Sequence, residues 1–331
     1  MKQKLLIFIF LLLFSSLQAQ EVPKNILVEH FTNSLCSICA NKNPGFYNTI
    51  EPYDKVIHIA YHPSSPYAAC VFSQHNPTEN DDRTNYYNLY GGTPRLVVNG
   101  EVLAASSNLI SNPILDAQNN LSSAFEIQIE QFQYSSDSMY SEITISKKAA
   151  SSENLAELYV LLSEKEIAYS SPNGEDIHHD VFRKFLLQDE QFNLPSIGNE
   201  TSIFVGSKID QDWQAKELTT TVFLQNSSSK EIIQAEQSDK LNFTMSIALN
   251  KLIDKAIYPN PTKDFLYVNN DMLLLQKIEI YSIIGTLVHE ENLEDRLRAK
   301  IDAQEFGEGN YILRIYAKNK EVYAKKIVID Y

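Results

Sequence analysis

The feature that most constrains this chain is a pair of cysteines separated by two residues, at Cys36 and Cys39. Residues 26–32, directly before the pair, are apolar and β-prone, which predicts a buried strand. Residues 40–47, directly after it, predict a helix kinked at Pro44. A cysteine between a strand and a helix has its sulfur at the helix N-terminus, where unpaired N–H groups and the helix dipole favour the thiolate. The pattern is therefore typical of a redox dithiol.

With these residues, the N-terminal part of the chain resembles the thioredoxin superfamily. Pro44 lies five residues after Cys39, where thioredoxins have their helix-kinking proline. Thr93 and Pro94 precede a further predicted strand, and thioredoxin-like folds have a cis-proline there that faces the dithiol. The resemblance implies a thioredoxin-like α/β domain over residues 20–123.

The same resemblance implies roles for individual residues. Cys36 is expected to be the attacking thiolate, and Cys39 the resolving thiol that closes the mixed disulfide. Thr93 and Pro94 are expected to line the substrate groove, where backbone groups of Thr93 would pair with an extended substrate segment.

The proton acceptor is less closely defined, because the sequence departs from the thioredoxin pattern. Leu35 stands in place of the usual tryptophan, and the inner dipeptide is Ser-Ile instead of Gly-Pro, a dipeptide that helps to set the reduction potential. The buried acid of thioredoxins falls at or beside His30, with Glu29 adjacent. Either residue could accept a proton from Cys39, and an imidazole would couple the redox chemistry to pH differently.

Two other interpretations of the cysteine pair stay open. Conditions outside the cytoplasm favour a permanent structural disulfide, although so short a loop gives it a small entropic contribution. A zinc site needs four ligands, and no second such pair exists, although His58, His62, Cys70 and His75 could be recruited. We therefore expect no metal and no cofactor. Cys70 itself is expected to be a buried apolar residue or a second resolving thiol.

The N-terminus and the charge indicate an exported protein. Residues 1–19 combine two lysines, an unbroken apolar run and a small-residue cleavage site, which predicts a signal peptide. No later stretch has the length of a transmembrane helix, so we expect no transmembrane segment. The formal net charge of −14 argues against nucleic acid and anionic lipid as partners.

From residue 124 onwards the pattern changes to strands only. Roughly seven short strands, separated by polar turns, predict an antiparallel β-sandwich over residues 124–248. Residues 178–184 and 221–226 are similar to those of an outer-membrane-associated family in which a β domain follows a thioredoxin-like module. That similarity includes no catalytic motif.

The C-terminal segment, residues 256–331, follows a predicted linker at 249–255. It opens on the sequence Ile-Tyr-Pro-Asn-Pro at 257–261 and continues with short alternating strands and glycines at turns, which predicts a small β-sandwich. The segment resembles the type A sorting domain of the type IX secretion system of Gram-negative bacteria. The resemblance implies recognition by that secretion machinery, and release or attachment at the cell surface.

The sequence therefore predicts a multidomain protein of the α/β plus all-β class, with a thioredoxin-like head, an antiparallel β-sandwich and a C-terminal sorting domain. As an enzyme it would be a thiol–disulfide oxidoreductase that acts on protein dithiols or disulfides at the cell surface or outside. The alternative is a non-catalytic surface binding or adhesion protein, in which Cys36 and Cys39 form a structural disulfide.

Overall fold

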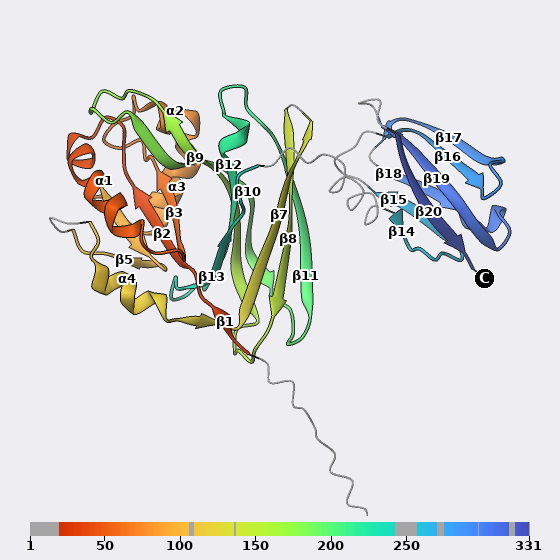
Figure 1. The fold of residues 1–331 in the computed structure, drawn as a ribbon, viewed down its shortest axis with the longest axis horizontal. Coiled ribbons are helices and arrows are strands. Elements are labelled where there is room, and N and C mark those ends of the chain that lie inside the picture. The colour runs from red at the N-terminus through yellow and green to blue at the C-terminus, as the bar shows by residue number, and fades with distance from the viewer. Residues whose placement is uncertain are drawn as a thin grey trace, which may run out of the picture. The chain divides into compact units, whose positions relative to one another are not determined.

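The structure is a computed structural model that describes residues 20–105, 109–135, 137–241, 257–269, 275–296, 298–317 and 322–330. The predicted signal peptide and the predicted linker lie outside these residues. The chain forms two compact units. The first contains almost all of an eight-stranded sheet, and most residues of the second come from the C-terminal part of the sequence. All four α-helices of the described residues belong to the first unit (Figure 1).

The described helices are α1 (Ser37–Ile50), α2 (Val71–His75), α3 (Pro77–Tyr86) and α4 (Asn112–Asn119), with short 3-10 helices at Ala215–Glu217 and Ala303–Glu305. The eight-stranded sheet has the order β13 (Ile232–Gln237), β12 (Leu218–Gln225), β9 (Leu155–Ala168), β10 (Ile177–Asn193), β3 (Val56–Tyr61), β2 (Ile26–Phe31), β4 (Arg95–Val98), β5 (Glu101–Val102). A three-stranded sheet has the order β11 (Glu200–Lys208), β8 (Ser138–Lys147), β7 (Phe125–Ser135), and β1 (Val22–Pro23) pairs with β6 (Ser122–Ser123).

Strand β2 contributes side chains to the apolar core on both faces of the eight-stranded sheet. All six of its residues are buried. On one face Ile26 and Val28 pack with Phe46 of α1, and on the other Leu27 packs with Phe223 of β12. The predicted strand at 26–32 and the predicted helix with Pro44 inside it are confirmed as β2 and α1. The peptide bond between Thr93 and Pro94 is cis, as expected.

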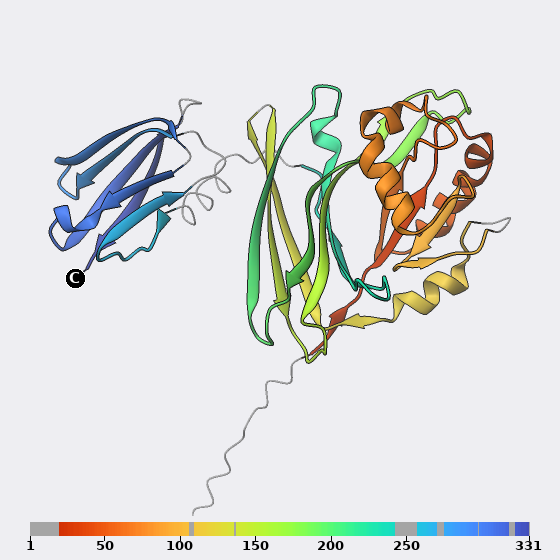
Figure 2. The same ribbon diagram turned by 180° about the vertical axis from the view of Figure 1, so that it is seen from behind.

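The expected fold class is nevertheless wrong. The structure is mostly β, and strands of the predicted head and of the predicted middle sandwich form one continuous sheet (Figures 1 and 2). The junction is a parallel pairing of β10 with β3, in register at Val181 and Ala60. A thioredoxin-like α/β domain and a separate antiparallel sandwich are therefore not supported. Without β10, strand β3 would present an unpaired edge, which is why the two parts join there. The sequence does not predict this pairing, because the alternation of side chains does not reveal which strand covers an edge.

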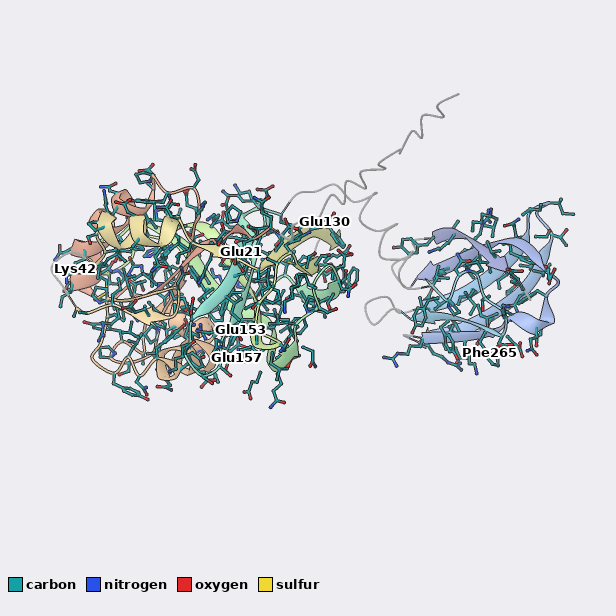
Figure 3. The ribbon with its side chains drawn as sticks, turned by 90° about the horizontal axis from the view of Figure 1, so that it is seen from below. Glu21, Lys42, Glu130, Glu153, Glu157 and Phe265 are labelled. Atoms are coloured by element: carbon teal, nitrogen blue, oxygen red, sulfur yellow. A yellow bond between two sulfur atoms is a disulfide. The ribbon has the colours of Figure 1, made fainter. Side chains whose placement is uncertain are left out.

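The C-terminal part contains two sheets that bury a shared apolar core. One sheet has the order β14 (Ile257–Tyr258), β15 (Phe265–Asn269), β18 (Arg298–Asp302), and the other β17 (Leu287–Arg296), β16 (Leu275–Ser282), β19 (Gly309–Ala317), β20 (Val322–Ile329). Leu266 and Ile301 of the first sheet are buried in one cluster with Ile280 and Leu313 of the second. Figure 3 labels Phe265 at the start of β15. Within the described residues, no helix is long and apolar enough to span a membrane.

A buried ion pair between Glu29 and Arg83 links helix α3 to strands β2 and β12 of the eight-stranded sheet. Arg83 Nε and Nη2 donate to the two Glu29 carboxylate oxygens at 2.6 and 3.0 Å, and the Tyr87 hydroxyl donates to one of them at 2.7 Å. Gln225 of β12 accepts from Arg83 Nη2 at 3.0 Å. The guanidinium also lies 4.7–5.1 Å from the ring centroids of four aromatic residues, Tyr86, Tyr87, Tyr159 and Phe223.

Removal of one partner of this pair should strongly destabilise the protein. We expect Arg83→Met to lower the free energy of unfolding by about 3–5 kcal/mol, because it leaves the Glu29 carboxylate buried without its counter-charge. Urea unfolding of the mature protein measures the change. The control Lys240→Met removes a more exposed partner of Glu217 and should cost about 1 kcal/mol or less. A loss for Arg83→Met as small as that of the control would contradict the prediction.

Candidate functional site

Cys36 and Cys39 form a disulfide at the N-terminus of α1. Cys36 is the N-cap residue, with extended backbone, and its sulfur accepts a hydrogen bond from the Cys39 backbone N–H at 3.1 Å. The same sulfur lies 3.6 Å from the carbonyl oxygen of Thr93. Both cysteines have 0% exposed surface. The structure thus brings Cys36, Cys39 and Thr93 together, as predicted from the sequence.

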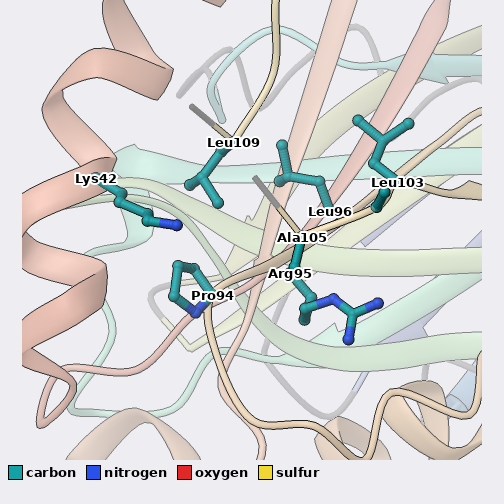
Figure 4. A pocket seen from close by; sticks show the side chains of 8 residues that line it. Lys42, Pro94, Arg95, Leu96, Leu103, Ala105 and Leu109 are labelled. Carbon is teal, nitrogen blue, oxygen red and sulfur yellow. The ribbon is translucent and has the colours of Figure 1, made fainter. Parts of the chain in front are cut away.

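A small pocket lies beside this group, at the start of β4. Its lining is mostly apolar and includes Pro94, Leu96 and Leu109. Lys42 extends from α1 towards Pro94, and Arg95 lines the same pocket (Figure 4). Lys42 is also labelled in Figure 3. The predicted substrate-contacting residue Pro94 therefore borders a recess that combines apolar side chains with two cations.

Glu29 and His30 lie on opposite faces of β2, since successive side chains of a strand alternate. The structure places Glu29 in the ion pair with Arg83, where both carboxylate oxygens are bound. His30 lies on the face covered by α1, with its ring centroid 4.6 Å from that of Phe46. Of the two predicted proton acceptors, His30 is thus the one on the side of the dithiol helix.

A chain of three buried polar side chains ends at His30. Asp180 of β10 contacts Lys165 at 2.7 Å and His58 Nδ1 at 2.9 Å through its two carboxylate oxygens. His58 Nε2 in turn lies 3.4 Å from His30 Nδ1. The remaining nitrogen, His30 Nε2, is buried and has no hydrogen-bond partner among the described residues.

The environment fixes the charges in this chain. Burial lowers the pKa of His58, although the hydrogen bond to Asp180 opposes the shift. Burial lowers the pKa of His30 well below its usual value, and the neighbouring His58 and His62 add to the effect. Burial by itself would raise the pKa of Asp180, but His58 and Lys165 hold it below its usual value. At neutral pH the Asp180 side chain is therefore a carboxylate, and His58 and His30 are uncharged imidazoles.

The charges also determine the tautomers. A carboxylate only accepts hydrogen bonds, so His58 Nδ1 must carry the proton that it shares with Asp180. His58 Nε2 is then an acceptor, and His30 Nδ1 must be the donor. It follows that His30 Nε2 holds a free lone pair. From the sequence, His58 was considered only as a possible zinc ligand and Asp180 was given no role; the one signal was that His58 is a polar residue in the otherwise apolar strand β3.

The loop between β9 and β10 also belongs to this site, although the sequence did not indicate this. The Asn173 side-chain amide donates to the carbonyl oxygens of Cys36 at 3.2 Å and Asn33 at 3.3 Å. Glu175 accepts from Asn43 of α1 at 2.7 Å. The sequence around Asn173 predicts a turn, but nothing in it indicates that the turn contacts residues about 140 positions earlier.

Cys70 and the histidines proposed for zinc are engaged in other contacts. Cys70 is buried, and its sulfur lies 3.1 Å from the Ser34 hydroxyl. His62 is buried against the Phe72 ring, and burial lowers its pKa to about 3. Among the residues that the structure describes, no group of three or more His, Cys, Asp or Glu side chains is placed to hold a metal ion.

Comparison with known proteins identifies the C-terminal part. Residues 256–330 match the family described as the secretion system C-terminal sorting domain. A stretch of 87 residues is 26% identical to the ulvan lyase NLR42 of Nonlabens ulvanivorans, and it spans 26% of this chain but only 16% of the lyase.

Among solved structures, HBP35 of Porphyromonas gingivalis is similar over 93% of this chain and 99% of its own, with a TM-score of 0.56 and 18% identity. This similarity shows a shared fold. A domain of the outer membrane lipoprotein Omp28 from Porphyromonas gingivalis matches 37% of this chain and 92% of its own, at 9% identity and a TM-score of 0.28, which is too low to support an argument. The predicted sorting domain is thus confirmed, and it indicates export across the outer membrane to the cell surface or outside.

Proposed function

We propose that this protein is an exported thiol–disulfide oxidoreductase whose reactive pair is Cys36 and Cys39. The observation that carries the proposal is the position of the Cys36 sulfur at the N-cap of α1, where it accepts the Cys39 N–H. An N–H donor and the helix dipole stabilise negative charge on that sulfur, so Cys36 would be the thiolate in the reduced protein.

The reaction would proceed by two exchanges. The Cys36 thiolate attacks a disulfide of the substrate protein, forms a mixed disulfide and releases one substrate thiolate, which takes up a proton. Cys39 then loses its proton and attacks the Cys36 sulfur, which releases the second substrate thiolate and forms the Cys36–Cys39 disulfide. The substrate gains two electrons, and the protein must be reduced again by an external thiol.

His30 is the residue that best suits the proton transfer in the second exchange. It is uncharged, its Nε2 lone pair is unpartnered within the described part of the chain, and it lies beneath α1. Because burial keeps its pKa well below the usual value, Nε2 would hold the proton only transiently, with the positive charge partly offset through His58 by the Asp180 carboxylate. Glu29 would take no part, because its carboxylate is bound by Arg83 on the other face of β2.

The substrate would be an extended polypeptide segment placed along Thr93 and Pro94. The Thr93 carbonyl oxygen beside the Cys36 sulfur would guide the segment, and the recess beyond Pro94 would take an apolar side chain next to the substrate cysteine. The sorting domain would deliver this activity to the cell surface or the surroundings.

A second candidate function rests on the burial of both cysteines. A disulfide with no exposed surface is protected from exchange, as a structural disulfide should be. On this view the protein is a non-catalytic surface binding or adhesion protein. The two candidates predict different reduction potentials.

A redox titration distinguishes these functions. We expect the Cys36–Cys39 pair of the mature protein, titrated against glutathione and followed by alkylation and mass spectrometry, to have a potential of about −120 to −270 mV. We also expect Cys36→Ser to abolish reduction of a protein disulfide, because it removes the attacking thiolate, while urea unfolding shows an intact fold. A potential below about −300 mV would instead support the structural disulfide.

The uncharged state of His30 predicts a pH dependence of stability. The pKa of His30 is lower in the folded protein than in the unfolded chain. As the pH falls through about 6.5, the unfolded chain therefore binds a proton that the folded protein does not bind. The contribution of the neutral imidazole is thus complete above pH 6.5 and is lost as the pH falls below it. Between about pH 6.5 and 5, the free energy of unfolding should therefore decrease less steeply with falling pH in His30→Phe than in wild type. We expect the two slopes to differ by about 1.4 kcal/mol per pH unit. An unchanged slope in urea titrations would contradict the prediction, because it would mean that His30 takes up its proton over the same pH range in the folded and unfolded protein.

A further inference from the structure

One residue of the β9–β10 loop donates to three carbonyl groups of the turn that carries Cys36. Besides its side-chain bonds to the Asn33 and Cys36 carbonyls, Asn173 donates its backbone N–H to the Ser34 carbonyl at 3.3 Å. Asn33 is itself held in place, because its side-chain amide donates to the Pro63 carbonyl at 3.1 Å. The turn before α1 is therefore held on one side by the segment that follows β3 and on the other by Asn173.

The loop has its own internal structure, so it contacts the dithiol turn as a unit. Ser171 N–H donates to the Glu175 carbonyl at 2.8 Å, and Gly174 N–H donates to the Ser171 carbonyl at 2.9 Å. Gly174 has a φ of +96°, which the turn requires and which a larger residue would strain. Pro172 and Gly174 are exposed, whereas Asn173 and Glu175 are half-buried against the turn and α1.

The contacts between loop and turn are weaker than those within the loop. The two N–H bonds of the Asn173 side chain are shared among three acceptors, and the shortest contact, 2.6 Å, goes to Glu175 of the same loop. The contacts to the dithiol turn are 3.2–3.3 Å long. Separation of the loop from this turn would thus leave the internal bonds of the loop intact, with the Glu175 contact to Asn43 as its strongest remaining attachment.

We propose that residues 170–176 form a latch on the dithiol, and that Asn173 is the positioning residue that holds the Cys36 turn in its closed, buried state. In the closed state both sulfurs lack exposed surface, as the structure shows. Opening of the latch removes the Asn173 donors from the turn, while the Cys36 carbonyl keeps its bond from the Ala40 N–H, and it lets the turn present its sulfur to a reaction partner. The relevance of the latch to turnover rests on the proposed function, whereas its effect on access to the disulfide does not.

Reduction of the disulfide by a small phosphine tests the latch directly. We use the mature protein and tris(2-carboxyethyl)phosphine, which takes up oxygen from water as the disulfide becomes two thiols, and we follow the thiols by alkylation. For Asn173→Ala we expect the rate constant to rise about five- to tenfold, because the closed turn loses its side-chain donors. The matched control is Asn154→Ala, which removes an amide that donates to the Ser152 carbonyl in an exposed loop, and its rate should stay at the wild-type value.

Further variants keep the test decisive. Glu175→Gln removes the charge that binds Asn43 and Asn173, and it should raise the rate in the same direction without shortening a side chain. If Asn173→Ala lowers the midpoint of urea unfolding, the comparison is made with Glu175→Gln instead. Equal rates in wild type, Asn173→Ala and Glu175→Gln would overturn the latch. Faster phosphine reduction together with no turnover of a protein disulfide by wild type would support the latch and reject the proposed enzyme.

Discussion

The arrangement of the eight-stranded sheet depends on one buried ion pair, between Glu29 and Arg83. A carboxylate in the middle of a buried strand is costly unless charge and hydrogen bonds compensate it, and here an arginine and a tyrosine do so, while a glutamine binds both of these donors. The glutamine, Gln225, comes from β12, almost 200 residues further along the chain. Strand β12, from the middle of the sequence, therefore stabilises the two donors of the carboxylate, because Gln225 accepts from Arg83 and donates to the Tyr87 hydroxyl.

This constraint also shapes the chemistry at the dithiol. Since Glu29 is bound on one face of β2, the face beneath α1 is left with His30 as its titratable group on this strand. An uncharged imidazole needs less compensation when buried than a carboxylate does, and His58 supplies a partner for one of its nitrogens. The second nitrogen has no hydrogen-bond partner among the described residues, which is why we propose it as the base. Glu29 and His30 lie on opposite faces of β2 because they are neighbours in sequence and the side chains of a strand alternate with a period of two residues.

The sequence was informative about local structure and much less so about pairing. The strand before Cys36 and the helix that contains Pro44 follow from short-range patterns, whereas the cis bond before Pro94 was implied by the family resemblance. The partner of β3 does not, because an apolar strand suits many neighbours equally well, and the fold class was wrong for that reason. Asn173 was beyond reach for the same reason: a polar turn shows that the chain reverses, but not which backbone carbonyls it meets.

The β9–β10 hairpin supplies both distant parts of the site. Its strand β10 carries Asp180, which orients His58, and its loop carries Asn173, which holds the Cys36 turn. Asp180 has a φ of +51° and lies between the paired residues His179 and Val181, so its position depends on the register with β9. A slip of one residue in that register would turn side chains to the opposite face and displace the loop as well. The contacts from Asp180 through His58 to His30 and the contacts of the loop with the Cys36 turn are thus coupled through the register of one strand pair, so the surroundings of the disulfide depend on the hairpin as well as on the cysteine motif.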